Sequence, residues 1–310
     1  MRTLRITLLA ALAALAVAAC GSSSKNTSSS SAASSKPGAG KPAVVIGDKN
    51  FTEEYVLGDL YSQALQAKGY KVKLKPNIGS SEITYKALTS GQIDMYPEYT
   101  GTLLTAIAGQ TTLPTSAQQA YSQAKAYAEK HGLTVLNPTP FYDSDAIGAL
   151  KSFAQKNNLK TIPDLKKLGH SLILGGAPEF ATRPEEGLIG LKKEYGINPT
   201  FKPIAIGLTY KALDSGQVQV SDVFTTDAQL TSGKYTVLTD PKKIFGFQNV
   251  APVVKQSVLS AEGPAFAQTL NAVSALLTIP AIQKMNAAVA LDKQDPATVA
   301  HQFLVANHLA

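Results

Sequence analysis

A near-repeat is the feature that most constrains the fold of this chain of 310 residues. Segments 83–102 and 208–227 share the pattern TYKAL-x-SGQ, and the two copies lie 125 residues apart. The glycine of each pattern, Gly91 or Gly216, stands where a helix C-cap is expected, and a short β-rich run follows it. Each copy therefore predicts a helix, a tight turn, a strand and a new helix start. Two copies of one α/β unit predict two similar lobes.

A second pair of matching segments supports this interpretation. Gly47-Asp-Lys-Asn-Phe51 and Gly176-Ala-Pro-Glu-Phe180 each follow an apolar run and precede a predicted helix. Strands that alternate with helices predict mostly parallel sheets, which bind ligands beyond the carboxyl ends of their strands. Two lobes whose strand ends face each other would form a cleft. The turns expected there are 49–51, 96–102, 179–183 and 224–227.

The predicted elements divide the chain into two lobes. The first is expected to have strands at 43–47, 70–75 and 92–96 and helices at 53–68 and 81–90. The second is expected to have strands at 147–150, 171–174, 200–204, 218–223 and 234–238 and helices at 183–195 and 207–215. The run VAPVV at 250–254 returns the chain to the first lobe, where helices at 260–277, 280–291 and 295–307 pack. We assign 43–145 plus 249–310 to lobe 1 and 146–248 to lobe 2.

The first residues are typical of an export signal. A basic start, Met1 to Arg5, precedes an apolar run too short to span a bilayer comfortably, and residues 1–19 are predicted to be a signal peptide. The sequence Val-Ala-Ala-Cys20-Gly matches a lipobox, although an ordinary signal peptide with a chance cysteine would look similar. Cys20 is the only cysteine and has no disulfide partner. We expect a lipidated Cys20 that anchors the chain to the extracytoplasmic face of the cell membrane.

Composition indicates a flexible segment near the N-terminus and limits the kinds of partner that the chain could bind. Residues 20–42 are rich in Ser, Ala and Gly and predict a flexible tether. The formal charge is +7, and removal of Arg2 and Arg5 with the leader leaves 27 basic against 22 acidic side chains, or +5. The lysines are scattered and not interleaved with aromatic residues, so nucleic acid is a poor candidate partner and a solvated basic surface is the simpler interpretation. We expect a monomer.

The expected turns carry motifs that resemble one family. These motifs are Gly47-x-Lys-x-Phe-Thr-Glu53, Tyr96-Pro-Glu-Tyr-Thr-Gly-Thr102, Pro178-Glu-Phe-Ala-Thr-Arg183 with Gly187, and Thr225-Thr-Asp227. They closely resemble the binding proteins for glycine betaine, choline and carnitine that feed osmoprotectant ABC importers. The resemblance implies a two-lobed, type II periplasmic-binding-protein-like α/β fold with two hinge crossover strands. It also implies a permease and its ATPase as partners, and no cofactor.

The resemblance also implies how the ligand is held. A quaternary nitrogen has no proton to donate, so the family holds it by cation–π attraction in a cage of aromatic rings. A carboxylate at the other end of the ligand needs donors. The residues that match family ligand contacts are Tyr99, Thr102, Lys49 on the carboxylate side, Arg183, Phe224 in place of a cage tyrosine, Tyr142 and Asp145 of the hinge loop, and Gln248 in place of another tyrosine.

This chain departs from a four-tyrosine cage. It keeps Tyr99, replaces one ring with Phe224, and lacks rings at Gln248 and near Ala146, where Tyr142 is a candidate substitute. A half-aromatic cage favours a cation and also leaves room for another small organic solute.

Each site residue also has a structural interpretation. Tyr99 and Phe224 could be core, Lys49 and Arg183 could be surface ion pairs, and Asp145 could cap the hinge. Thr182-Arg-Pro-Glu185 matches a capping box and predicts a helix start. We expect Phe51 and Phe180 to be core, and Glu98 and Glu179 to orient their loops.

No pattern for catalysis is present in the sequence. The four histidines, at 131, 170, 301 and 308, are isolated, and Gly169-His-Ser-Leu-Ile173 lacks the second glycine of a nucleophile elbow. We therefore expect a binding protein and no metal. An exported enzyme, or an assembly lipoprotein without a small ligand, is the alternative class.

Overall fold

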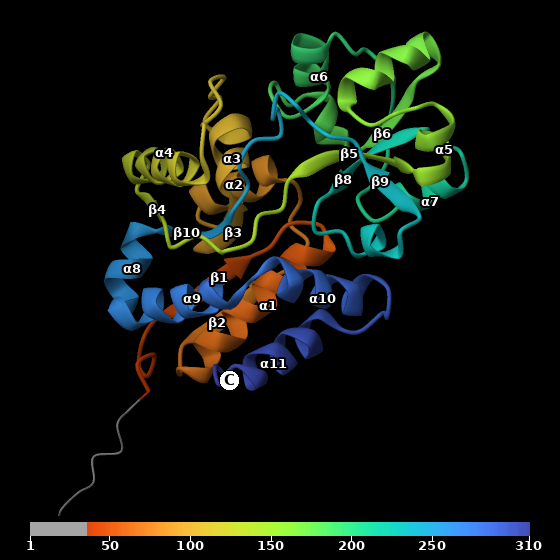
Figure 1. The fold of residues 1–310 in the computed structure, drawn as a ribbon. Coiled ribbons are helices and arrows are strands. Elements are labelled where there is room, and N and C mark those ends of the chain that lie inside the picture. The colour runs from red at the N-terminus through yellow and green to blue at the C-terminus, as the bar shows by residue number, and fades with distance from the viewer. Residues whose placement is uncertain (1–35) are drawn as a thin grey trace, which may run out of the picture. The chain divides into compact units, whose positions relative to one another are not determined.

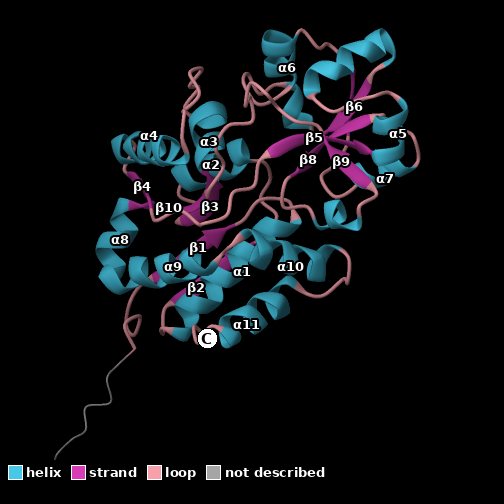
Figure 2. Cartoon of the chain, in the orientation of Figure 1, coloured by secondary structure: helices cyan, strands magenta, loops and turns pink. Residues whose placement is uncertain are grey.

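The computed structural model describes residues 36–310, which contain two five-stranded sheets (Figures 1 and 2). The first sheet has the order β2 (Lys71–Lys75), β1 (Ala43–Gly47), β3 (Met95–Tyr99), β10 (Val250–Lys255) and β4 (Leu133–Val135). The second has the order β7 (Thr200–Pro203), β6 (Ile173–Gly176), β8 (Val220–Phe224), β5 (Asp145–Leu150) and β9 (Tyr235–Val237). In each sheet the first three strands run parallel, and the fourth pairs antiparallel with the third.

The sequence repeat accounts for this matched order. Helix α2 (Ser81–Thr89) leads into the central strand β3, and helix α7 (Thr209–Asp214) leads into the central strand β8. Both helices end at a glycine with left-handed backbone, φ +82° at Gly91 and +68° at Gly216, a conformation that costs other residues steric strain. The predicted helix, turn and strand is confirmed in both copies.

Helices cover the first sheet on both faces. One face packs on α1 (Thr52–Ala67), α9 (Pro264–Leu276), α10 (Ile279–Ala290) and α11 (Pro296–Ala306), as Figure 1 shows. The other face packs on α2 and α4 (Ala117–Lys130), with α3 (Thr100–Thr102) and the π-helical turn Leu103–Ile107 beside them. Helix α8 (Gln256–Glu262) follows β10. The apolar contacts on both faces hold the carboxyl ends of β1 and β3 in fixed positions.

The second sheet has shorter helical elements. They are α5 (Lys151–Lys156), α6 (Leu188–Tyr195) and α7, with 3-10 segments at Ile162–Ser171, Pro178–Ala181 and Ala228–Ser232. A separate cluster of buried apolar side chains, including Ile147, Leu174 and Val220, packs this sheet against α5, α6 and the first 3-10 segment. The two sheets therefore have separate cores, both inside the single compact unit Lys36–Ala310.

Three predicted elements are wrong in their bounds. The helix expected at 260–277 is divided at Gly263, which has φ +81°, between α8 and α9. The strand expected at 92–96 lies at Met95–Tyr99, so Tyr99 ends the strand. The helix expected from residue 183 begins at Leu188, and the capping box does not form. Glu185 instead accepts two hydrogen bonds from Lys193 Nζ, both 3.0 Å, and the hydroxyl of Thr182 donates to the carbonyl of Glu179. Helix α4 and strand β4 were not anticipated.

Two connections link the sheets. One leaves β4 and enters β5 at Asp145, and the other leaves the second sheet and enters β10 at Val250. Tyr142 and Asn249 form an antiparallel bridge where the connections meet, and the Asn249 amide donates to the carbonyls of Thr139 and Phe141. The two connections are therefore held side by side.

The described chain begins with a turn at residues 36–40. The amide of Gly38 donates to the carbonyl of Lys68, and a Cβ at Gly38 would lie 2.2 Å from the backbone nitrogen of Tyr70. This part of the expected 20–42 tether is therefore packed on the first sheet's helices. The predicted signal peptide, Cys20 and the tether up to residue 35 lie outside the described residues.

Across residues 36–310, no single helix has the length and apolar character needed to cross a membrane. Helices α9 and α10 meet that requirement only when taken together, and they are bent by 88°.

Candidate functional site

A pocket lies where the carboxyl ends of strands from both sheets meet. The turns after β1, β3, β6 and β8 line it, as expected from the position of ligand sites in parallel sheets. The space left between the side chains is about 40 Å³. Seven of the eight residues predicted to bind ligand line this pocket: Lys49, Tyr99, Thr102, Asp145, Arg183, Phe224 and Gln248. Tyr142 does not line it and is 48% exposed.

Three aromatic rings are stacked at this pocket. Tyr99 ends β3 and Phe224 ends β8, at equivalent positions of the repeat. Phe51, from the turn after β1, stacks on both: its ring centroid is 6.2 Å from that of Tyr99 and 5.4 Å from that of Phe224, with interplanar angles of 23° and 14°. Phe51 also packs against the apolar core of the first sheet, so it belongs both to the core, as expected, and to the pocket wall, which was not predicted. Its position in an expected strand-end turn was the signal that could have identified it.

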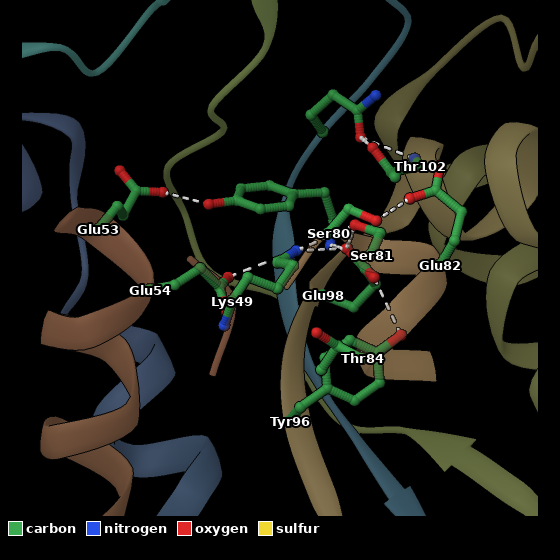
Figure 3. Close-up of polar contacts among 12 residues, drawn as sticks. Lys49, Glu53, Glu54, Ser80, Ser81, Glu82, Thr84, Tyr96, Glu98 and Thr102 are labelled. Atoms are coloured by element: carbon green, nitrogen blue, oxygen red, sulfur yellow. Dashed lines mark hydrogen bonds and ion pairs between the residues drawn. The ribbon is translucent and has the colours of Figure 1, made fainter. Parts of the chain in front are cut away.

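Lys49 is buried on the first-sheet side of the pocket. Its ammonium donates to Glu98 at 2.6 Å and to Ser81 at 3.4 Å, and lies 3.5 Å from Glu54 (Figure 3). It also lies 4.1 Å from the centroid of the Tyr99 ring. The side chain is 2% exposed. The charge of Lys49 is therefore compensated inside the protein, and Lys49 is not the surface ion pair considered above.

Glu98 organises the end of β3. It accepts hydrogen bonds from the hydroxyls of Ser81 and Tyr96 and from the backbone amide of Tyr99, at 3.1, 2.9 and 2.8 Å. Together with Lys49, these donors satisfy a carboxylate that is almost fully buried. Its contacts agree with the expectation that it orients the loop. The neighbouring Glu54 has its pKa raised to about 8 by burial, against the opposing effect of Lys49.

Arg183 is the basic residue of the second-sheet side. Its guanidinium lies 3.3 Å from Glu82, 3.6 Å from Glu186 and 3.9 Å from Asp145, and the side chain is 12% exposed. Burial lowers the pKa of Arg183, but the three carboxylates outweigh burial and raise it. Arg183 therefore carries its charge at the pocket wall and links β5 to α2 of the first-sheet side.

Gln248 occupies the position where the resemblance implies a tyrosine. Its side-chain oxygen accepts from the backbone amide of Thr102 at 2.9 Å and from the Thr102 hydroxyl at 3.3 Å. Its amide donates to Glu186 at 2.9 Å and to the carbonyl of Phe245 at 3.2 Å. A Cβ on Gly101 would lie 2.7 Å from this side chain. A polar link between α3 and Glu186 therefore stands where the resemblance implies a tyrosine in some members.

The pocket has more carboxyl groups than basic groups. Its lining includes the four acids Asp143, Asp145, Glu179 and Asp222, against Lys49 and Arg183. Burial raises the pKa of Asp145 and, more strongly, those of Asp143 and Asp222. In the described residues no group of acids, histidines or cysteines has a metal-binding arrangement. Because burial raises the pKa of Asp143 and Asp222, the lining carries less negative charge than its number of carboxyl groups suggests, and the aromatic rings are the feature that favours a cation.

Glu53 connects the ring stack to both sheets. It is buried in the first turn of α1 and accepts hydrogen bonds from the Tyr99 hydroxyl at 2.8 Å, from the Thr226 hydroxyl at 2.6 Å and from the Asn286 amide at 2.9 Å. Thr226 follows β8, and Asn286 lies in α10. We did not single out Glu53 from the sequence, although it closes the Gly47–Glu53 motif.

The fold and the pocket together define a class of protein. Two α/β sheets of matched strand order, with two connections and a pocket at the facing strand ends, form the type II fold of periplasmic binding proteins. Residues 42–306 match the family described as the substrate-binding domain of the ABC-type glycine betaine transport system. The chain belongs to this family. It is therefore the extracytoplasmic substrate-binding component of an ABC importer, a class of binding proteins and not of enzymes.

Similar proteins support this assignment. A glycine-betaine-binding protein of Pseudomonas aeruginosa is 33% identical over 276 residues, which cover 85% of this chain and 88% of that protein. The glycine betaine-binding protein YehZ of Escherichia coli is 30% identical, over 84% of this chain and 89% of YehZ. A crystal structure described as a glycine betaine/carnitine/choline ABC transporter superposes with a TM-score of 0.68 at 26% identity, covering 86% of this chain and 99% of that structure.

Proposed function

We propose that the pocket binds a quaternary ammonium solute such as glycine betaine, choline or carnitine, which the protein delivers to its permease. The observation that carries this proposal is the stack of Tyr99, Phe51 and Phe224 at the pocket. Each ring that faces the cation contributes about 0.5–2 kcal/mol of binding free energy. The names of the similar proteins from Pseudomonas aeruginosa and Escherichia coli support the same ligand class.

The residues have separate roles in this proposal. Tyr99 and Phe224 contact the trimethylammonium group, with Phe51 between them as the third ring. Arg183 and Thr102 donate hydrogen bonds to the carboxylate of a betaine. Lys49 supports Tyr99 and Glu98 from within, and Asp145 holds Arg183. Because Gln248 stands where the resemblance implies a tyrosine, the cage has fewer aromatic rings. This favours a second candidate ligand, another small organic cation. Tyr142 would contribute only if the hinge loop moved.

Closure of two lobes is the proposed mechanism. Lobe 1 comprises 43–145 and 249–310, lobe 2 comprises 146–248, and they hinge at the paired connections. A ligand that contacts both lobes binds the closed form better and shifts the population toward it. The hydrogen bonds from Thr226 to Glu53 and from Arg183 to Glu82 join the two proposed lobes in this structure, and opening of the lobes would break them. Small-angle scattering should show a smaller radius of gyration with saturating ligand, and an unchanged radius would contradict closure.

The membrane anchor is a further part of the proposal. The lipobox and the single cysteine support a signal peptide of residues 1–19 and a diacylglyceryl-modified Cys20 as the mature N-terminus. A tether that runs from Cys20 to about residue 35 would keep the binding domain beside its permease. Mass spectrometry of the native protein should show a lipidated Cys20, and a secreted form that starts elsewhere would contradict it.

Titration calorimetry tests the ligand class. We expect saturable binding of at least one of glycine betaine, choline and carnitine, at one site per chain. If none of the three binds at millimolar concentration, the proposed ligand class is wrong even though the family assignment stands.

A further inference from the structure

The two copies of the repeat carry an exposed apolar side chain at the same position. Ile83 precedes Thr-Tyr-Lys in the first copy and is 55% exposed, and Leu208 precedes the same three residues in the second copy and is 54% exposed. The alanine and leucine that follow in the pattern are buried in both copies, so the core accounts for them. Single exposed apolar residues are common on protein surfaces. A pair at matched positions indicates a role for both outside the core.

Both residues stand beside the ligand pocket. Ser80 and Ser81, which shortly precede Ile83, line the pocket, and so does Ile206, two residues before Leu208. Neither Ile83 nor Leu208 lines the pocket itself. The pair therefore flanks the pocket from outside, with Ile83 on the first-sheet side and Leu208 on the second-sheet side.

The pair also lies on the side of the sheets away from the two connections. Helix α2 follows the edge strand β2 directly, and helix α7 follows the edge strand β7. The connections run between β4 and β5 and between β9 and β10, and these strands stand at the opposite ends of the two sheets. Lobes that hinge at the connections would separate most beside β2 and β7. Ile83 and Leu208 therefore stand where the pocket would open, and closure would change the distance between them.

Each apolar residue has an exposed lysine near it. Lys86 comes three residues after Ile83 and Lys211 three residues after Leu208, a spacing that makes side chains neighbours on a helix. Glu82, the acid next to Ile83, is already paired with Arg183. Both copies thus offer an apolar side chain beside a positive charge. Such a surface fits a partner with acidic side chains, because complementary charges speed association and fix its register.

We propose that Ile83 and Leu208, each with its lysine, form the docking surface for the permease of the importer. The permease receives the ligand, and the pair lies where the pocket would open to release it. A permease that contacts both residues would distinguish the closed form from the open form, because only one spacing of the pair fits it. Its matching surface would have two apolar pockets, each beside a carboxylate. This inference goes beyond the proposed function and does not depend on which solute binds.

Polar replacement of the apolar pair tests the docking surface. The variants of the full-length protein are Ile83→Gln, Leu208→Gln and the double variant, with Val305→Gln of α11 as the control at a position that is 53% exposed. The measurement is the concentration of binding protein that gives half-maximal ATP hydrolysis by the cognate permease–ATPase complex in nanodiscs. We expect this concentration to rise about three- to tenfold in each single variant and about ten- to a hundredfold in the double variant, since distant sites contribute independently. The control should match wild type.

Ligand binding and folding are measured beside docking. Glycine betaine, choline and carnitine are titrated by calorimetry, and those that bind are used at saturation in the ATPase assay. If none binds, the proposed function fails, and the docking comparison is made with the unliganded protein. Both single variants should bind ligand within about twofold of wild type and keep its melting temperature, because neither side chain lines the pocket.

Three results would overturn the docking surface. The first is a wild-type half-maximal concentration in the double variant. The second is a loss of equal size in Val305→Gln. The third is a wild-type dimer in sedimentation that the double variant dissociates, which would make the pair a contact between two copies of this chain.

The lysines should give a smaller effect that depends on salt. Lys86→Gln combined with Lys211→Gln should raise the half-maximal concentration about two- to fivefold at low salt, and the difference should vanish at high salt. The matched control combines Lys130→Gln and Lys284→Gln, two exposed lysines at the end of α4 and in α10. An equal effect of the two pairs, or no effect of the first, would contradict the part of the lysines in the docking surface.

Discussion

The two strand ends that the repeat places at the pocket are equivalent in position and different in anchoring. Tyr99 at the end of β3 is buried, its hydroxyl is bonded to Glu53, and its ring lies under the Lys49 ammonium. Phe224 at the end of β8 is half-buried and has no hydroxyl, and its ring stacks on Phe51. One sheet therefore presents a fixed ring and the other a ring held by stacking alone. Because the Tyr99 ring is held in place, part of the ligand contacts is pre-organised before the Phe224 ring contacts the ligand.

The turns after β1 and β6 also differ in how firmly they hold the side chains at the pocket. The first turn carries the buried ionisable residues Asp48 and Lys49, and the matching positions of the second are Ala177 and Pro178. Asp48 accepts from the amide of Asn77 at 2.7 Å, and its other oxygen has no partner in the described chain. Charge is thus concentrated in the first-sheet turn, where it fixes the side chains that hold Tyr99.

Alanine at the two rings should give the largest contrast. Tyr99→Ala removes a buried ring and leaves Glu53 without one donor, so it should lower the free energy of unfolding by about 3–5 kcal/mol. Phe224→Ala should cost about 1–2 kcal/mol because its ring is only half-buried. Each should weaken choline binding about five- to thirtyfold through one lost cation–π contact. Denaturant titration and calorimetry check both, and equal destabilisation by the two variants would refute the contrast in anchoring.

Arg183 should separate ligands with a carboxylate from ligands without one. Lys49 is paired at 2.6 Å with Glu98, whereas the contacts of Arg183 to its three carboxylates are longer, 3.3 to 3.9 Å, so a ligand carboxylate can compete for the Arg183 donors. Arg183→Ala should weaken glycine betaine about ten- to a hundredfold, the value of a charged hydrogen bond, and change choline much less. Calorimetry with both ligands measures the ratio. An equal loss for both would mean that Arg183 acts only on the fold.

Glu53 should couple the fixed ring to the second sheet. Glu53→Gln replaces one acceptor oxygen by a donor. Either the Tyr99 hydroxyl must turn from donating to accepting, or the bonds from Thr226 and Asn286 to the other oxygen are disturbed, at about 1–3 kcal/mol of unfolding free energy. Affinity should fall by similar factors for glycine betaine and choline, because no ligand charge is touched. Thr226→Val is the control that removes one donor and retains the carboxylate. A Glu53→Gln variant as stable as wild type would show that the carboxylate does not hold the ring.

The charged first turn should make stability depend on pH. Burial raises the pKa of Asp48 from 3.8 to about 7, against the opposing hydrogen bond from Asn77. The folded state then holds a proton that the unfolded state releases, so this contribution is complete below about pH 3.8 and is lost as the pH rises to about 7. The slope from one group is at most about 1.4 kcal/mol per pH unit.

Asp48→Asn should flatten the fall in unfolding free energy between about pH 4 and pH 7, as measured by denaturant titration. The control is Asp164→Asn, whose carboxyl has a lowered pKa because Lys167 donates to it, and which should leave this interval unchanged. A wild-type profile that rises across the interval would contradict the role of Asp48.

The smallest expected effect is that of the Tyr99 hydroxyl. Tyr99→Phe keeps the ring face and removes only the bond to Glu53, so choline binding should weaken less than in Tyr99→Ala, by about threefold or less. A loss as large as that of the alanine variant would assign the effect to the hydroxyl and not to the ring.

Much of the fold could be predicted from the sequence because the repeat is local. The pattern that ends at Gly91 and Gly216 determines the helix, turn and strand of both copies without tertiary information. Helix α4 was missed because its buried face consists of the small residues Ala120, Ala124 and Ala128, which do not stand out in an Ala- and Gln-rich sequence. The start of α6 was misplaced because Glu185 pairs with Lys193.

The site was predictable where it follows the strand ends and not where it depends on contacts across the chain. Tyr99, Arg183 and Phe224 stand in turns that parallel sheets use for binding. The link from Gln248 to Glu186 joins residues 62 positions apart, and the hydrogen bond from Thr226 to Glu53 spans 173. An aromatic residue after a strand, such as Phe51, can pack inward or outward, and only the tertiary structure decides.

The central claim is that the pocket selects a permanent positive charge through stacked rings. The most direct test is calorimetry of choline against its neutral isostere, in which a tert-butyl group replaces trimethylammonium. The two have nearly the same shape, so apolar contact alone would bind them equally. The account predicts that choline binds about tenfold or more tightly, the value of two to three cation–π contacts. Equal affinity for the neutral isostere would contradict it.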